Sequence, residues 1–195
     1  SNADVNLQRL SNYYIDVVFK NGITKNADGS LCIEKIVDES LSELVIPKEL
    51  IFDGERRAIT EIASNACMNL KALTKLDLSG ATELKEIGEY AFAHAPHLKE
   101  VVLPTTINIE SVGQKLFYGS EYENNYYRNH GGKQFIVIGH ILYKYVGQTS
   151  ANGEVSFATN LNLGVSEYYT EGNTSGLTAD QIATLNQQLA GVTSI

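Results

Sequence analysis

The chain has 195 residues, 43% of them hydrophobic, which is enough for one elongated domain with a continuous core. Its 23 acidic and 15 basic side chains give a formal net charge of −8, and without a basic cluster this argues against nucleic acid as a partner, because phosphate neutralisation needs Lys and Arg. No apolar run approaches the roughly 20 residues of a membrane-spanning helix, so we expect no transmembrane segment within these residues.

The N-terminal region, residues 4–40, is predicted to form strands that cap the rest of the fold. It follows Ser-Asn-Ala at residues 1–3, which has the form of a tag remnant left by a protease. Residues 14–19 are rich in β-branched and aromatic side chains and favour a strand. Residues 31–36 favour a second strand, and the Asn21-Gly22 pair between them is a strong turn signal.

Residues 41–120 contain a repeat of fixed length. Five apolar positions recur at i and i+25, namely Leu73 with Leu98, Leu76 with Val101, Leu78 with Leu103, Ile87 with Val112, and Phe92 with Phe117. An upstream copy lies at i−32 in its first half and at i−25 in its second, which indicates an insertion within residues 48–57 that we expect to be an exposed turn. A period of about 20–29 residues with leucines two and three apart is typical of a leucine-rich-repeat solenoid.

Each repeat should contribute one short strand and one tight turn. Leu76 and Leu78 are expected to point inward and Asp77 outward, since the side chains of a strand alternate between faces. Val45 and Val102 hold the same outward position in the neighbouring repeats. The predicted fold is α/β: a short right-handed leucine-rich-repeat solenoid of short parallel strands and tight helical or 3-10 turns, with an N-terminal strand cap and a C-terminal helix.

The repeat resembles the BspA-like leucine-rich repeat of bacterial surface proteins. Its pattern L-x-x-L-x-L-P is carried by Leu98, Val101, Leu103 and Pro104, and its pattern I-x-x-x-A-F by Ile87, Ala91 and Phe92. Cys67, Ser79 and Leu116 depart from these patterns. The resemblance implies a protein at the cell surface or outside the cell, exported by a signal peptide ahead of residue 4. It also implies an adhesin-like, non-catalytic role in binding protein or glycan.

Residues 121–134 break the repeat with a run that is rich in tyrosine and almost free of aliphatic residues, so we expect a long exposed loop. Its tyrosines form a contact surface, because Tyr offers a large rigid area with a polar tip, or they lie back on the solenoid as part of an ordinary polar loop. The candidate partner-binding residues are Val45, Asp77 and Val102 on the strand face, and Tyr122, Tyr126 and Tyr127 in this loop.

The C-terminal part is predicted to hold a hairpin and a degenerate repeat in residues 135–165, then a linker and a helix in residues 166–195. Residues 135–145 resemble a hairpin that BspA-like proteins place between repeats. Thr178 and Gln181 have the spacing of a capping box, and an apolar stripe at i, i+3 and i+7 follows. Gly191 can end this helix, which we expect to cap the last turn of the solenoid.

No pattern in the sequence predicts catalysis, a cofactor or a metal site. His94 and His97 are three residues apart, but no Cys or carboxylate spacing supplies further ligands, so we expect solvated turn histidines. Acidic side chains are scattered, and no motif pairs two of them for acid–base work. Cys32 and Cys67 could pair in a secreted protein, but the buried phase of Cys67 favours two unpaired, buried thiols.

These observations favour a non-enzymatic surface protein that binds protein or glycan partners. Two alternatives stay open. One is a structural spacer or display module of a larger surface assembly, without a ligand of its own, and the other is an intracellular scaffold.

Overall fold

The computed structural model describes residues 1–104, 106, 108–146 and 179–194. The chain divides into two compact units, Ser1–Asn124 and Asn125–Ile195. The possible strand at residues 154–158 and the linker expected before the C-terminal helix lie outside the described residues.

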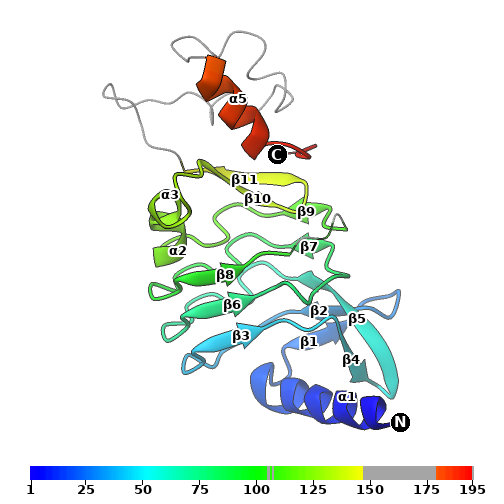
Figure 1. Ribbon diagram of the computed structural model, residues 1–195. Coiled ribbons are helices and arrows are strands. Elements are labelled where there is room, and N and C mark those ends of the chain that lie inside the picture. The colour runs from blue at the N-terminus through cyan, green and yellow to red at the C-terminus, as the bar shows by residue number, and fades with distance from the viewer. Residues whose placement is uncertain (105, 107, 147–178, 195) are drawn as a thin grey trace. The chain divides into compact units, whose positions relative to one another are not determined.

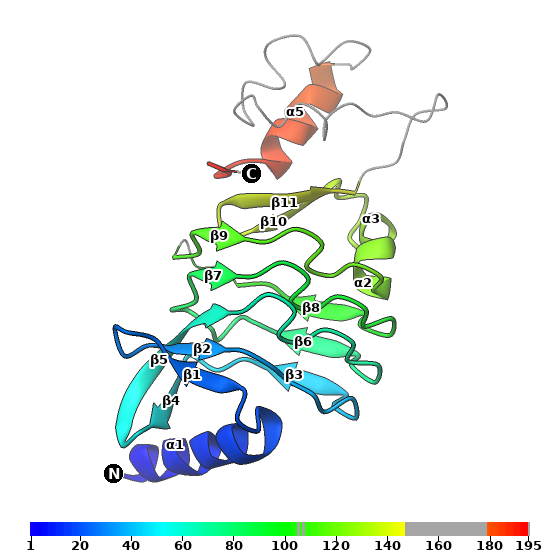
Figure 2. The same ribbon diagram turned by 180° about the vertical axis from the view of Figure 1, so that it is seen from behind.

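Two sheets run along opposite sides of the first unit (Figures 1 and 2). In one of them three parallel strands pair in the order β3–β6–β8, with Leu44 opposite Leu76 and Leu76 opposite Val101. These partners are related by i+32 and i+25 in the sequence, so the register predicted from the repeat is confirmed. The strands are β3 (Glu43–Val45), β6 (Lys75–Asp77) and β8 (Glu100–Val102).

The second sheet consists of segments that the sequence analysis had mostly not identified as strands. Its parallel part has the order β2–β5–β7–β9, with Glu61 opposite Glu86 and Glu86 opposite Ser111. Its strands are β1 (Ile23–Lys25), which pairs antiparallel with β2, then β2 (Leu31–Ile33), β5 (Glu55–Ile62), β7 (Glu86–Ile87) and β9 (Ser111–Val112). From β5 to β9, successive strands along the chain alternate between the two sheets, which makes the unit a coil, as the repeat predicted.

Apolar side chains from both sheets fill the interior of the coil. Leu76 from one sheet and Ile87 from the other are no more than 1% exposed. The rings of Phe92 and Phe117 lie in successive turns, with centroids 6.0 Å apart and an interplanar angle of 17°. Cys67 is buried one repeat earlier at the same position. We call Cys67, Phe92 and Phe117 the aromatic column, and its rings lie between layers as predicted.

The insertion at residues 48–57 is a β-hairpin, whereas we had expected a simple exposed turn. β4 (Glu49–Phe52) pairs antiparallel with the first half of β5, and Asp53 and Gly54 form the tip with φ angles of 53° and 76°. Two consecutive residues with positive φ suit the tight turn of a hairpin. Leu50 on β4 is fully buried, so one face of the hairpin packs on the protein.

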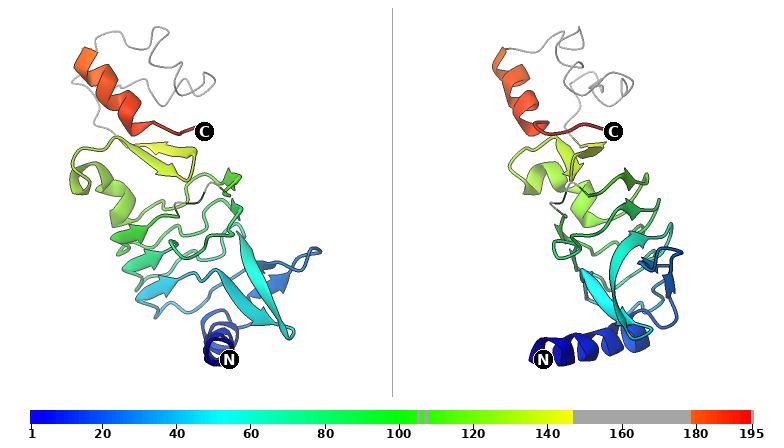
Figure 3. Two further views of the ribbon diagram at one scale, coloured as in Figure 1. Left: turned by 45° about the vertical axis from the view of Figure 1, so that its right-hand side comes forward. Right: turned by 90° about the vertical axis from the view of Figure 1, so that its right-hand side faces the viewer.

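The N-terminal cap begins with a helix, so the strand predicted for residues 14–19 was wrong. Helix α1 (Asn2–Tyr13) runs into a π-helix (Tyr14–Val18), and Figure 3 shows α1 lying beside β4 at the end of the coil. Ser11, Tyr14 and Val18 are buried at the i, i+3, i+7 spacing of one helix face. This helical period prevails over the β propensity of the individual residues.

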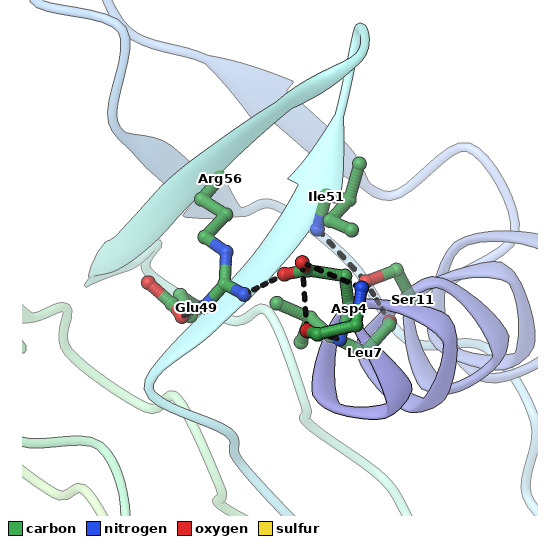
Figure 4. Close-up of polar contacts among 7 residues, drawn as sticks. Asp4, Leu7, Ser11, Glu49, Ile51 and Arg56 are labelled. Atoms are coloured by element: carbon green, nitrogen blue, oxygen red, sulfur yellow. Dashed lines mark hydrogen bonds and ion pairs between the residues drawn. The ribbon is translucent and has the colours of Figure 1, made fainter.

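Polar contacts fasten α1 to the hairpin (Figure 4). The Ser11 hydroxyl donates to the Leu7 carbonyl at 2.6 Å and accepts from the Ile51 backbone nitrogen at 2.8 Å. Arg56 pairs with Asp4 on α1 and with a glutamate on β4. The helix and the inserted hairpin therefore form the N-terminal end of the solenoid together.

The second unit contains α3 (Tyr126–Asn129), β10 (Phe135–Ile138), β11 (Ile141–Tyr145) and α5 (Ala179–Gln188). The predicted hairpin is confirmed, since β10 and β11 pair antiparallel, and so is the C-terminal helix. The Gln134 backbone nitrogen donates to the Gln188 side chain at 2.8 Å, and Ser194 forms an isolated parallel β-bridge with Ile141. Whether α5 caps the solenoid stays a prediction. None of the helices in the described ranges is long and apolar enough to cross a membrane.

Candidate functional site

The outer face of β3, β6 and β8 carries a row of three candidate residues. Val45 lies opposite Asp77, and Asp77 lies opposite Val102. Val45 is 45% exposed and Val102 39% exposed, while Asp77 is half-buried between them. The outward orientation expected for these three side chains is therefore confirmed. We call this surface the strand face.

A second row on the strand face is charged. Glu43, Lys75 and Glu100 lie two residues before the first row on their strands and therefore point to the same side. The Lys75 ammonium lies 3.4 Å from the Glu100 carboxylate. An exposed pair of this kind contributes little to stability. The strand face thus joins an exposed apolar pair to a row of charged side chains.

Asp77 is less free than its neighbours. Its carboxylate accepts hydrogen bonds from the Ser79 backbone nitrogen at 2.9 Å and the Ser79 hydroxyl at 2.6 Å. These bonds hold the pKa of the Asp77 carboxyl below its usual range, because they favour the ionised form. The group therefore offers a fixed negative charge at the centre of the strand face.

The open edge of this sheet at β3 accepts one side-chain hydrogen bond. The Tyr14 hydroxyl donates to the Val45 carbonyl at 2.6 Å, and burial raises the pKa of Tyr14. An edge strand with free carbonyls could otherwise pair with a strand of another protein. The Tyr14 hydroxyl therefore occupies one of the carbonyls through which a further strand could pair with β3.

Tyr122, proposed as part of a contact surface, belongs to the core instead. It is 2% exposed, its ring meets Phe117 edge-on with centroids 5.3 Å apart, and its backbone nitrogen donates to the Leu98 carbonyl at 2.8 Å. The long exposed loop was wrong here, because α2 (Glu121–Asn124) turns the tyrosine inward. Ser120 accepts from the Glu123 nitrogen at 3.1 Å, and the spacing S-x-x-E was a visible signal for this helix start.

The other two tyrosines lie in the second unit. Tyr126 is 7% exposed and stacks on the His130 ring at 4.0 Å, so of the two alternatives for the tyrosines its burial argues against an exposed contact residue. Tyr127 is half-buried, and its ring lies near Gly132. A role of these residues in partner binding stays a prediction, and the burial of Tyr126 weighs against it.

A different surface was missed by the sequence analysis. Each repeat turn contains two positions with positive φ, and each position recurs at i+25 in the next turn. The first has φ angles of 64°, 57° and 53° at Asn65, Tyr90 and Lys115, and the second has 67°, 58° and 81° at Asn69, His94 and Gly119. We call these six residues the left-handed ridge. The shared phase of the first three was visible in the sequence, but their conformation was not.

Backbone hydrogen bonds lock the ridge turns onto one another. The nitrogens of Asn65 and Asn69 donate to carbonyls of the next turn at 3.0 and 2.9 Å, and those of Tyr90 and His94 repeat the pattern at 3.1 and 2.8 Å. The side chains at one end of the ridge then meet. The Lys115 ammonium lies 5.8 Å from the Tyr90 ring centroid and 5.4 Å from that of Tyr118.

The histidines, cysteines and carboxylates of the described residues form no cluster for a metal ion. Among these residues, no group of three or more such side chains is placed to hold one. His97 is exposed as expected, but His94 is half-buried, with its ring edge-on to Tyr118 at 5.5 Å. Cys32 and Cys67 are both free and buried, in agreement with the prediction. Burial raises the pKa of both thiols.

Comparison with known proteins gives one clear match. The model of the family described as "BspA type Leucine rich repeat region" matches residues 18–133 in six copies. No match was found among curated proteins.

Several solved structures are also similar. A leucine-rich repeat protein from Bacteroides capillosus is 16% identical over 51% of this chain and 86% of its own, with a TM-score of 0.42. The T. pallidum leucine-rich repeat protein is 19% identical over 50% of this chain and 42% of its own, with a TM-score of 0.42. A leucine-rich repeat protein from Bacteroides ovatus is 17% identical over 52% of this chain and 32% of its own, with a TM-score of 0.40.

Proposed function

Because the chain belongs to the BspA-type leucine-rich-repeat family, we propose that it is a non-catalytic binding module that works at the cell surface or outside the cell. The family is a repeat-based interaction or surface module. An adhesin-like role, with a protein or a glycan as partner, is the function that fits this family and this chain best.

The exposed apolar pair on the strand face carries this proposal. Val45 and Val102 lie on either side of Asp77 in adjacent strands, and both are more than a third exposed. Apolar side chains on a flat, rigid sheet can be desolvated by a partner without an ordering cost in the backbone. The fixed charge of Asp77 and the charged row beside it supply polar groups that select the partner.

An array experiment tests this function. The biotinylated protein is applied to arrays of purified extracellular proteins and of glycans, beside a double variant with Val45→Lys and Val102→Lys. We expect at least one bound partner, whose signal the double variant loses, because two added ammonium groups would have to be desolvated. Val37→Lys is the matched control, since Val37 is 58% exposed and lies outside the strand face.

Two outcomes would contradict the proposal. A partner that binds the double variant as well as the wild type would exclude the strand face. A chain that captures nothing on either array would favour the alternative, a spacer or display module without its own ligand.

A further inference from the structure

We propose that one end of the left-handed ridge is a second binding site, and that its ligand is a short acidic saccharide or a terminal acidic sugar. The site consists of Tyr90, His94, Lys115 and Tyr118. It is separate from the strand face, and it deepens the proposed function by naming a ligand class.

The distribution of backbone strain is the first observation. Positive φ costs least at Gly and Asn, and three ridge positions use these residues: Asn65, Asn69 and Gly119. The other three ridge positions are Tyr90, His94 and Lys115, and this conformation is costly for Tyr90 and Lys115, whereas His adopts it more readily. Within the ridge, the two costly residues lie together, in contact through the Lys115 ammonium and the Tyr90 ring. Strained residues that persist in a cluster point to a function of their side chains.

The contacts within the cluster are the second observation. The Lys115 ammonium is held 5.8 Å and 5.4 Å from the centroids of two tyrosine rings, and the His94 imidazole lies edge-on to one of them at 5.5 Å. Tyr118 is nevertheless 47% exposed, and Lys115 is exposed. The site therefore presents one exposed aromatic ring, that of Tyr118, together with a cation that lies over both tyrosine rings and whose position is thereby restricted.

This chemistry fits an acidic sugar. The face of an aromatic ring is electron-rich, so it attracts the weakly positive C–H groups on the flat side of a sugar ring. The Lys115 ammonium can pair with a carboxylate, and the tyrosine hydroxyls and the imidazole can bond to sugar hydroxyls. Four side chains are too few for a protein partner, since a standard interface takes about 800 Å² from each side.

The net charge of the protein limits the length of the ligand. The chain carries −8 overall, so a long polyanion would be repelled by the rest of the surface. One ammonium can balance one carboxylate. We therefore assign the site to one acidic sugar residue with its immediate neighbours.

The test is a titration followed by ¹H–¹⁵N NMR, with the methyl glycoside of galacturonic acid, a single acidic sugar residue, as the probe and its methyl ester as the uncharged match. We expect the acid to shift the backbone amides of Tyr90, His94, Lys115 and Tyr118, and the ester to bind at least about tenfold more weakly. Raising the salt concentration should weaken the binding of the acid to the protein, because an exposed ion pair is screened. Absence of shifts at these four amides, or equal binding of acid and ester, would overturn the proposal.

Variants test whether the side chains of this cluster bind the probe. Lys115→Asn should lose the binding while its unfolding temperature stays equal to or above that of the wild type, because Asn tolerates positive φ as it does at Asn65. Lys115→Arg should keep the binding. Tyr118→Ala, at a position without positive φ, should also lose it. Lys75→Asn, at a half-buried lysine on the strand face, is the control, and an equal loss there would refute the site.

The strand-face variants make the two proposals independent. The Val45→Lys and Val102→Lys double variant should bind the acidic probe as the wild type does. If it does not, the ridge is not a separate site. If the double variant binds the probe while the arrays show no strand-face partner, the proposal for the strand face is refuted and the proposal for the ridge site is supported.

Discussion

Replacing Phe92 by Ala removes the ring at the centre of the aromatic column. The side chain is 0% exposed, and its ring lies 6.0 Å from that of Phe117. Burial of a phenylalanine contributes about 1.5–3 kcal/mol through the apolar area removed from water. The cavity left behind adds to this loss, so Phe92→Ala should reduce the free energy of unfolding by about 3–5 kcal/mol.

A loss of this size is large beside the total. Domains are stable by about 5–15 kcal/mol, so the variant would lose roughly a fifth of that stability or more. With a shift of about 2–4 °C for each kcal/mol in a chain of this length, the midpoint of thermal unfolding should fall by about 6–20 °C.

Circular dichroism is the suitable assay, because the chain contains no tryptophan for fluorescence. Urea unfolding of wild type and Phe92→Ala gives the midpoint and the slope, and an unchanged slope shows that stability alone has changed. Val37→Ala is the control, since Val37 is 58% exposed and should lose no more than about 0.5 kcal/mol. A loss below about 1 kcal/mol for Phe92→Ala would mean that the column does not hold the layers together, which would refute the reasoning.

Three further outcomes follow from single contacts. Gly113→Ala should destabilise the solenoid strongly, because a Cβ there would come within 2.2 Å of a backbone nitrogen in the preceding turn. Gly80→Ala is the control, since a Cβ added there has its nearest atom at 3.7 Å, and equal unfolding midpoints for the two variants would contradict the prediction. Cys32 and Cys67 should resist iodoacetamide in the folded protein and react in urea, as mass spectrometry can show, because burial raises the pKa of both thiols; alkylation at equal rates in both conditions would refute it. Asp77→Asn should be less stable than wild type near neutral pH, and the difference in the free energy of unfolding should vanish as the pH falls through the lowered pKa of the Asp77 carboxyl. Urea titrations at several pH values measure this, and a difference that does not change with pH would count against the hydrogen bonds to that carboxylate.

The periodic part of the chain could be predicted because periodicity is a global signal. The i, i+25 spacing of Leu76 and Val101 placed them opposite each other in neighbouring strands, and it fixed Asp77 on the outer face. An error of one residue would have moved every side chain to the other face, so the pattern left no ambiguity.

The ends of the repeat were harder, because local propensity and tertiary burial disagree there. Residues 14–19 have the composition of a strand, yet Tyr14 and Val18 lie on the buried face of a helical segment that begins at Asn2. The prediction of an exposed loop for the tyrosine-rich residues 121–134 was wrong at Tyr122 for a related reason. The composition of these residues suggested exposure, whereas the Ser120 cap turns Tyr122 onto Phe117.

The ridge could not be predicted at all from residue types. Tyr90 and Lys115 are poor candidates for positive φ, and only the hydrogen bonds between turns, which hold each backbone in place, make that conformation tolerable. Sequence rules fail most where a side chain is retained against the preference of its backbone.

The hairpin of β4 and β5 shows how this architecture can accept new material. β5 pairs with β4 through residues Glu55 to Ala58 and with β7 through Glu61 and Ile62. The first half of this strand therefore belongs to the hairpin, which we call the arm, and its second half belongs to the coil. The tip at Asp53 and Gly54 lies at the far end of the arm from the pairing with β7. Lengthening the arm by whole pairs of residues would leave the alternation of inward and outward side chains in β5 unchanged. The tip is therefore a natural grafting point, at which a peptide epitope could be carried on the solenoid while the layers beneath keep their stacking.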